Sequence, residues 1–165
     1  VELGVHLANG SGIAKDDAQA RKLFERAAEA GNPRGIANLA ALSSSGAQSD
    51  PAKARALLSK AAETNADAQF QLGFMLANGA GGPKDDVAAR ASFERAAAQN
   101  HSGALEWMGS FTRSGRGGPQ DSTAAKVYYE RAASLGNENA REDLKQLQCP
   151  YVLKDKRANV ISHLC

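Results

Sequence analysis

The chain carries few side chains whose type and spacing could support catalysis or metal binding. Its three histidines, His6, His101 and His163, lie far apart and lack the spacing of metal ligands. A site built from Cys149, His163 and Cys165 would have only three ligands. The two cysteines also have a better structural explanation than a Cys–His nucleophile, given below. We therefore expect no metal, no cofactor and no catalytic residue.

Three glycine-rich segments, 10–16, 79–85 and 115–121, could suggest phosphate binding. The second reads G-A-G-G-P-K-D and lacks the G-K-[S/T] ending that brings a lysine and a hydroxyl to a bound nucleotide. Each segment also lies between two predicted helices and not after a strand. We interpret all three as turns. The sequence contains no metalloprotease, esterase or calcium-loop pattern.

Aromatic side chains are better candidates for a binding site. Phe70 and Phe74 lie one helical turn apart, on a helix face that packing does not require. Trp107 lies beside them in phase, one helix along, so we predict that the three form an apolar anchor for a partner. Polar side chains would form the rim of this anchor: Gln71, Glu106 and Arg113. The alternative is that the aromatics pack between neighbouring helices, as we expect of Met75 and Phe111.

These residues depend on a helical unit that recurs every 33 to 36 residues. In each copy an Asp that could begin a helix precedes an alanine by four residues, and a large apolar residue and an Ala-Ala pair follow on the same face. Gly or Asn then tolerates the left-handed conformation that ends a helix. Such a period predicts an all-α solenoid. The aspartates are Asp16, Asp50, Asp85 and Asp121, and the large residues are Phe24, Leu58, Phe93 and Tyr129.

A second helix precedes each of these units, and small residues mark its packing face. In the third and fourth copies this face reads Ala68, Leu72, Gly73, Leu76 and Ala104, Met108, Gly109, Thr112. The pattern resembles the Sel-one-like repeat family, a relative of the tetratricopeptide repeats. The resemblance covers residues 1–148, as four repeats plus a capping helix. The second copy is the most degenerate, with Ala40 and Ser43 in place of the family's Gly and Tyr.

The resemblance implies a right-handed α/α superhelix whose first helices line a concave groove, where Phe70, Phe74 and Trp107 would lie. It also implies protein–protein contact and no catalytic residues. The composition agrees, because a net charge of +2 argues against a dedicated nucleic-acid binder. No apolar run is long enough to insert into a membrane. The chain starts inside a predicted helix at Val1, so we expect a mature or truncated chain and leave open what precedes it.

The repeat pattern stops after Gln148, and residues 149–165 form a separate segment. Two β-prone runs, 151–153 and 160–161, predict a β-hairpin that caps the end of the solenoid. Cys149 and Cys165 bracket it, and a disulfide between them would close a loop of roughly 15 residues, worth about 3 kcal/mol. This disulfide predicts a periplasmic or secreted protein. Two free thiols, the alternative, would favour the cytoplasm.

The sequence therefore favours a non-catalytic protein–protein interaction scaffold, or adaptor, in a bacterial envelope. A sharper alternative is an immunity protein that neutralises a secreted antibacterial toxin. An alternative of another class is a cell-wall enzyme, which would need a pair of carboxylates in the groove, where we place only Glu106. The chain could also be a binding module cut from a longer polypeptide. The oligomeric state stays open.

Overall fold

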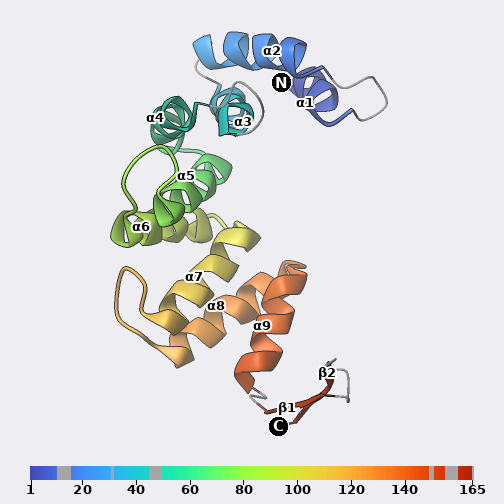
Figure 1. Ribbon diagram of the computed structural model, residues 1–165, viewed down its shortest axis with the longest axis vertical. Helices are drawn as coiled ribbons and strands as arrows, with labels where there is room; N and C mark the ends of the chain where they lie inside the picture. The colour runs from blue at the N-terminus through green and yellow to red at the C-terminus, as the bar shows by residue number, and fades with distance from the viewer. Residues whose placement is uncertain (11–15, 31, 45–49, 149–150, 155–159, 165) are drawn as a thin grey trace.

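The computed structural model describes residues 1–10, 16–30, 32–44, 50–148, 151–154 and 160–164. Within these ranges, helices occupy the chain up to residue 148 and two strands follow (Figure 1). The helices are α1 (Glu2–Asn9), α2 (Asp17–Glu29), α3 (Pro33–Ser44), α4 (Pro51–Ala61), α5 (Ala66–Asn78), α6 (Asp86–Ala98), α7 (Ser102–Ser114), α8 (Ser122–Ser134) and α9 (Glu138–Gln148).

Each second helix begins at the aspartate that the repeat pattern marks. The carboxylate accepts a hydrogen bond from a backbone N–H three residues on, at 2.9 to 3.0 Å in all four copies. Asn100 and Gly136 adopt the expected positive φ, 60° and 88°. Asn65 does not: its φ is −102°, and its side chain accepts a hydrogen bond from the N–H of Ala68, so it begins α5. Gly31 lies outside the described residues.

Small residues of the first helices receive the large residues of the second helices. A Cβ added at Gly73 would lie 2.7 Å from the ring of Phe93, and one at Gly109 would lie 2.6 Å from the ring of Tyr129. In the second copy the first-helix residue is larger (Ala40 in place of Gly) and the second-helix residue is smaller (Leu58 in place of an aromatic residue), and the two share one buried cluster. This confirms the expectation that small residues mark close helix contacts.

Arginines connect one repeat to the next. Arg55 of α4 donates to the Pro83 carbonyl oxygen at 3.0 Å, and Arg90 of α6 donates to the carbonyl oxygen of Arg116 at 3.4 Å. Arg116 in turn donates to the Asp86 carboxylate at 2.5 Å, a bond that holds the pKa of Asp86 below its usual value. The side chains of Asp86 and Arg90 thus both contact the turn of the following repeat.

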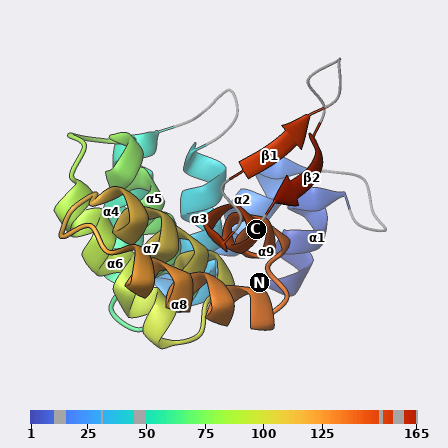
Figure 2. The same cartoon turned by 90° about the horizontal axis from the view of Figure 1, so that it is seen from below.

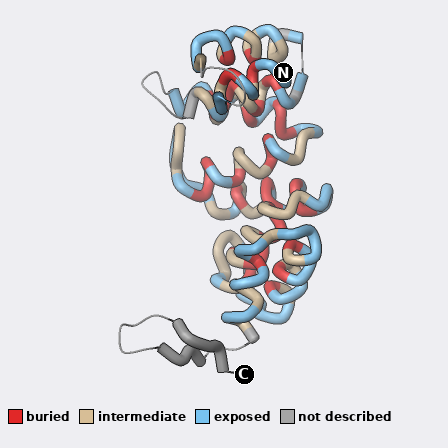
Figure 3. The backbone as a smooth tube through the Cα atoms, turned by 90° about the vertical axis from the view of Figure 1, so that its right-hand side faces the viewer, coloured by how far each residue is buried: buried red, intermediate tan, exposed pale blue. Residues whose placement is uncertain are grey.

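The helices stack into an arc. Figure 1 shows α3 nearer than α4, and α5 nearer than α6, to the hollow side of the arc. Buried residues run along the stack and do not gather in one centre (Figure 3). Among the residues that the structure describes, they form three clusters: one over α1 to α3, one over α3 to α5 and one from α5 to α9. This is the layered core of a solenoid.

The last described segments form a two-stranded antiparallel sheet of β1 (Tyr151–Lys154) and β2 (Val160–Leu164). Tyr151 pairs with Leu164 and Leu153 with Ser162, and the register shifts between Leu153 and Lys154. Figure 2 shows the two strands side by side. Cys149 and Cys165 lie outside the described residues, so the disulfide that would staple this hairpin stays a prediction.

Candidate functional site

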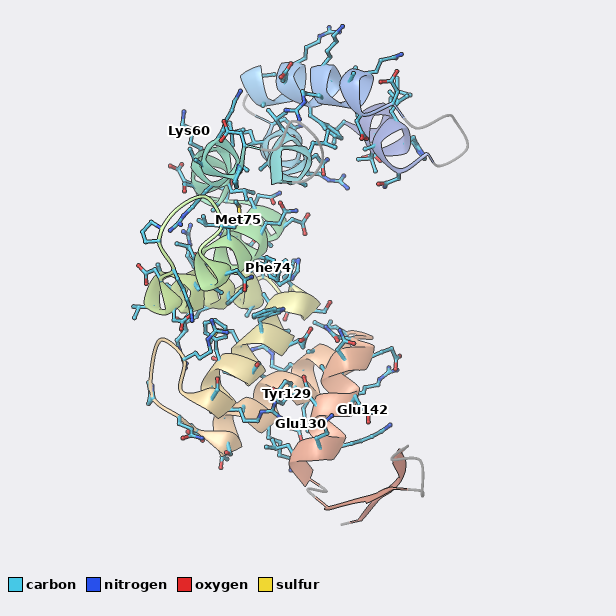
Figure 4. The ribbon with its side chains drawn as sticks, viewed as in Figure 1. Lys60, Phe74, Met75, Tyr129, Glu130 and Glu142 are labelled. Atoms are coloured by element: carbon cyan, nitrogen blue, oxygen red, sulfur yellow. The ribbon has the colours of Figure 1, made fainter. Side chains whose placement is uncertain are left out.

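The first part of the site is an aromatic patch on α5 and α7, the first helices of the third and fourth repeats, formed by Phe70, Phe74 and Trp107. The side chain of Phe74 is 46% exposed, and its ring meets the edge of Trp107 with 5.4 Å between centroids. Figure 4 labels Phe74 between the ribbons of α5 and α7. Trp107 is half-buried and stacks on the buried ring of Phe93 at 5.4 Å. Trp107 therefore connects an exposed ring to the core.

Phe70 is half-buried, with one face covered by His101. The two rings stack at 4.6 Å, and the Phe93 ring lies 5.9 Å from Phe70 on the core side. His101 begins α7, where its Nδ1 accepts a hydrogen bond from the N–H of Ala104 at 3.1 Å. Its repeat phase could have revealed this, since it precedes Ala104 by three residues, as Asn65 precedes Ala68.

A hollow of about 490 Å³ adjoins the patch, between α3, α4 and α5. Its lining is mostly apolar and includes Ala41, Leu58, Phe70, Gln71, Phe74 and Met75. The repeat explains it, because the second copy has alanines at 37 and 41 where the third has the two phenylalanines. The missing rings leave space beside α5. Met75, at the hollow's floor, is buried, as is Phe111, which confirms the packing role predicted for both.

Glu106 and Arg113 lie apart from that hollow, in a polar cluster with Tyr129 of α8 and Asp143 of α9. Burial raises the pKa of Glu106, and the charge of Asp143 raises it further, against lowering hydrogen bonds from asparagines 137 and 139. Burial also raises the pKa of Asp143, against the lowering effect of Arg113. The Arg113 guanidinium carbon lies 5.9 Å from the centroid of the Tyr129 ring. The cluster thus places two partly buried carboxylates beside one cation.

The hydroxyl of Tyr129 is buried within this cluster. The residue is 0% exposed, and its Oη makes no hydrogen bond of ordinary geometry among the described residues, although the Ser110 side chain lies close enough to act as a weak partner. Burial raises the pKa of Tyr129 to about 12, and the charges of Asp143 and Glu106 act in the same direction, against the lowering effects of Arg113 and Ser110. Figure 4 labels Tyr129 where α8 meets α9. An unsatisfied buried hydroxyl is uncommon and costs stability.

The six predicted residues therefore fall into two groups. Phe70, Gln71 and Phe74 line the hollow from α5, and Trp107 of α7 contacts the Phe74 ring. Glu106 and Arg113 belong instead to the polar cluster. The sequence analysis placed only Glu106 in the groove and did not foresee Asp143, whose charge acts on Glu106. The missed signal is repeat phase, because Asp143 follows Ala140 as Trp107 follows Ala104.

The described side chains contain no group of three or more His, Cys, Asp or Glu residues able to hold a metal ion. The three-ligand metal site considered in the sequence analysis lies outside the described side chains, because it would use Cys149, His163 and Cys165. Over the same described ranges, no helix has the length and apolarity to cross a bilayer. What the site offers is an exposed aromatic surface, an apolar hollow and a carboxylate-rich cluster.

The fold and this inner surface define an α/α solenoid of repeated helix pairs, which confirms the predicted all-α class. The chain belongs to the Sel1 repeat family: the model of that repeat matches residues 1–32, 33–64, 66–101 and 102–137. Proteins of this family are generally protein-interaction scaffolds and typically non-catalytic. A search of curated proteins gave no match.

Solved structures of the family are similar to this chain. A protective antigen of uropathogenic Escherichia coli with an SLR fold is 30% identical, with a TM-score of 0.81, over 90% of this chain and 32% of the antigen. A Sel1 repeat protein from Oxalobacter formigenes has the same identity and TM-score, over 90% of this chain and 62% of its own. Helicobacter pylori cysteine rich protein B is 27% identical, with a TM-score of 0.64, over 79% of this chain and 96% of its own. The chain thus spans less than two thirds of the first two relatives.

Proposed function

We propose that the chain is a non-catalytic scaffold that binds another protein or peptide through the aromatic patch and the adjoining hollow. The observation that carries this is the exposure of Phe74 against Trp107. Among the described large apolar residues that are exposed, Phe74 is the only aromatic one. Exposed aromatics held by a packed neighbour are frequent hot spots of protein interfaces. The general role of the family supports the same function.

The hollow gives this surface a place for a partner's side chain. Its volume of about 490 Å³ falls within the range of ligand pockets, about 300 to 1,000 Å³. Its mostly apolar lining suits an aliphatic or aromatic side chain, and Gln71 supplies one amide for orientation. Phe70 and Phe74 line it from α5, so an occupant would contact the aromatic patch at the same time.

The test is affinity capture from an extract of the native host. We would compare the wild type with a Phe74→Ala/Trp107→Ala variant and with a control that removes exposed apolar side chains from second helices, Val87→Ala/Val127→Ala. Both valines are more than half exposed, at 68% and 52%, so the control changes the surface without touching the patch. A protein retained by the wild type and the control, but not by the patch variant, is the expected result. Equal retention by all three would contradict the proposal.

The envelope location belongs to the same proposal and rests on the predicted Cys149–Cys165 disulfide. Titration of thiols in the denatured, unreduced protein tests it. No reactive thiol is expected, and two reactive thiols would move the protein to a reducing compartment. The immunity role is the narrower form of the proposal. It predicts an adjacent toxin gene and protection of cells that co-express that toxin, and a general adaptor would give no protection.

A cell-wall enzyme is the alternative of another class, and the Glu106–Asp143 pair is the feature that favours it. Glycoside hydrolysis commonly uses two carboxylates, one with a raised pKa that acts as the acid. The wild type should not clear a suspension of peptidoglycan, because the family is typically non-catalytic. Clearing that is lost in Glu106→Gln would replace the scaffold by an enzyme.

A further inference from the structure

The hollow between α3, α4 and α5 has a counterpart one repeat further along the chain, around α5, α6 and α7. Each residue of its lining corresponds there to a residue 33 to 36 positions later. The backbones pack alike in the two places. A Cβ added at Gly81 would lie 2.1 Å from the carbonyl oxygen of Pro51, and the equivalent Gly117 and Asp86 give the same distance. The hollow therefore arises from its side chains and not from a wider spacing of the backbone.

In the later repeat, aromatic rings fill the corresponding space. The ring of Trp107 stacks on that of Phe93 with 5.4 Å between centroids, and it meets the Phe74 ring at 5.4 Å. Phe93 also meets Phe111 at 5.3 Å. The hollow is therefore this aromatic cluster without its rings. The residues at the equivalent positions are Leu58 for Phe93, Gln71 for Trp107, Ala41 for Phe74 and Met75 for Phe111.

We infer that the hollow binds a tryptophan side chain of the partner, in the place that Trp107 occupies one repeat later. This inference rests on the proposed function, because the tryptophan would belong to the protein or peptide held at the aromatic patch. The hollow is continuous with that patch, since Phe74 lines the hollow and also contacts the Trp107 ring. The internal repeat thus supplies the template for the residue that the partner must carry.

A partner side chain can reach the hollow from the surface. Ala41, Pro51 and Phe74 form its rim and are exposed. Leu58 and Met75 form its floor and are buried. A ring that enters past the rim would contact this apolar floor, as the Trp107 ring contacts Phe93 in the later repeat.

A tryptophan suits the lining better than an aliphatic residue. Phe70 and Phe74 both line the hollow, and an aromatic side chain can make edge-to-face contacts with them that leucine cannot make. Gln71 is the one amide side chain among the described lining residues. Its amide oxygen can accept a hydrogen bond from an indole N–H, which phenylalanine lacks.

A basic residue suits the hollow less well. In the later repeat a guanidinium occupies one end of the corresponding space: Arg116 lies 4.3 Å over the Phe111 ring and donates to the Asp86 carboxylate. The hollow has Ala80 in place of this arginine and Pro51 in place of this aspartate. None of its described lining residues is charged, so a partner cation would lose water without gaining an ion pair.

A tryptophan built into the chain tests whether the hollow accepts an indole. Gln71→Trp places the ring at the position equivalent to Trp107 and should raise the urea midpoint by about 0.5 M. Val87→Trp, the matched control on the exposed face of α6, should leave the midpoint unchanged. A midpoint that falls in Gln71→Trp would mean that the hollow cannot hold an indole, and it would overturn the inference.

Peptide selection tests recognition of a partner. The wild type would select binders from a random dodecapeptide library displayed on phage, and the retained sequences should share a tryptophan. The best peptide would be synthesised as selected and with leucine in place of that tryptophan, and the leucine form should bind about tenfold more weakly, or worse. Gln71→Trp, whose own ring fills the hollow, should weaken the tryptophan peptide at least tenfold, whereas Val87→Trp should bind it as the wild type does.

The outcomes separate this inference from the proposed function. Selected peptides that lack tryptophan, equal binding of the two synthetic peptides, or undiminished binding by Gln71→Trp would overturn the inference alone. Loss of those peptides in Phe74→Ala/Trp107→Ala would then still support the scaffold. Failure of the wild type to retain any peptide above that patch variant would overturn both.

Discussion

Phe93 and Phe74 make the sharpest test of which aromatics hold the fold and which are available to a partner. Phe93 is 0% exposed, and its ring meets those of Phe70, Trp107 and Phe111 at 5.9, 5.4 and 5.3 Å. Phe93→Ala would remove a fully buried ring and leave a cavity, which costs about 3 to 5 kcal/mol. Since that ring has contacts on all sides, we expect a value of about 4 kcal/mol.

Phe74→Ala should cost much less. Nearly half of the Phe74 side chain is already in water, and Trp107 is the one ring that it contacts among the described aromatics. About half of the 1.5 to 3 kcal/mol for burying such a side chain, plus about 0.5 kcal/mol for one edge contact, gives roughly 1.5 kcal/mol. Water can fill the space left at the surface, so no cavity cost is added.

Urea unfolding would measure both variants, followed by circular dichroism and by fluorescence. Trp107 is the only tryptophan, so its fluorescence reports on the α5–α7 region even if the repeats unfold in steps. With a slope of about 2 kcal/mol per molar, the midpoint should fall by about 2 M for Phe93→Ala and by less than about 1 M for Phe74→Ala. Equal shifts would place Phe74 in the core and refute the reasoning behind the aromatic patch.

Three further predictions concern α7 to α9. Gly109→Ala should destabilise by more than about 2 kcal/mol in urea unfolding, because its Cβ would lie 2.6 Å from the Tyr129 ring. The comparison variant Gly118→Ala should cost less, because its Cβ would meet only the end of the Arg90 side chain, at 3.1 Å. A carboxyl group whose pKa is raised in the folded state favours folding at low pH, and this contribution is lost as pH rises through that pKa. Glu106→Gln/Asp143→Asn should therefore be more stable than the wild type at pH 7, and the two proteins should be equally stable below about pH 4. A stability gain that persists below about pH 4 would contradict the argument from burial. In a phenolate absorbance titration the wild type and Tyr129→Phe should differ only as pH approaches 12, and a difference near pH 10 would mean an accessible hydroxyl.

The repeat could be predicted from the sequence because each of its features acts over a short distance along the chain. A capping aspartate, a small face and one large residue recur in phase, and each has its effect within one helix or between adjacent helices. The four capping aspartates and the glycine–aromatic contacts follow directly. The second copy also packs closely, because the larger Ala40 on its first helix is matched by the smaller Leu58 on its second helix.

The site was harder to predict because it depends on contacts between repeats. The stack of His101 on Phe70 and the approach of Asp143 to Glu106 join side chains about 31 and 37 positions apart, in different helix pairs. Periodicity places a residue on a helix face but does not say which side chain of the next repeat covers it. The hollow beside α5 likewise arises from what the second copy lacks.

Site-specific photo-cross-linking tests the central claim most directly, because it asks where the partner lies without changing its affinity through a lost contact. A photoreactive phenylalanine would replace Phe74 on the inner surface and, in a separate protein, Val87 on the outer helix α6; both positions are exposed. Illumination in extracts of the native host should give a specific protein adduct from position 74 and none from position 87. Adducts from position 87 alone would place the partner on the outer helices and contradict the account.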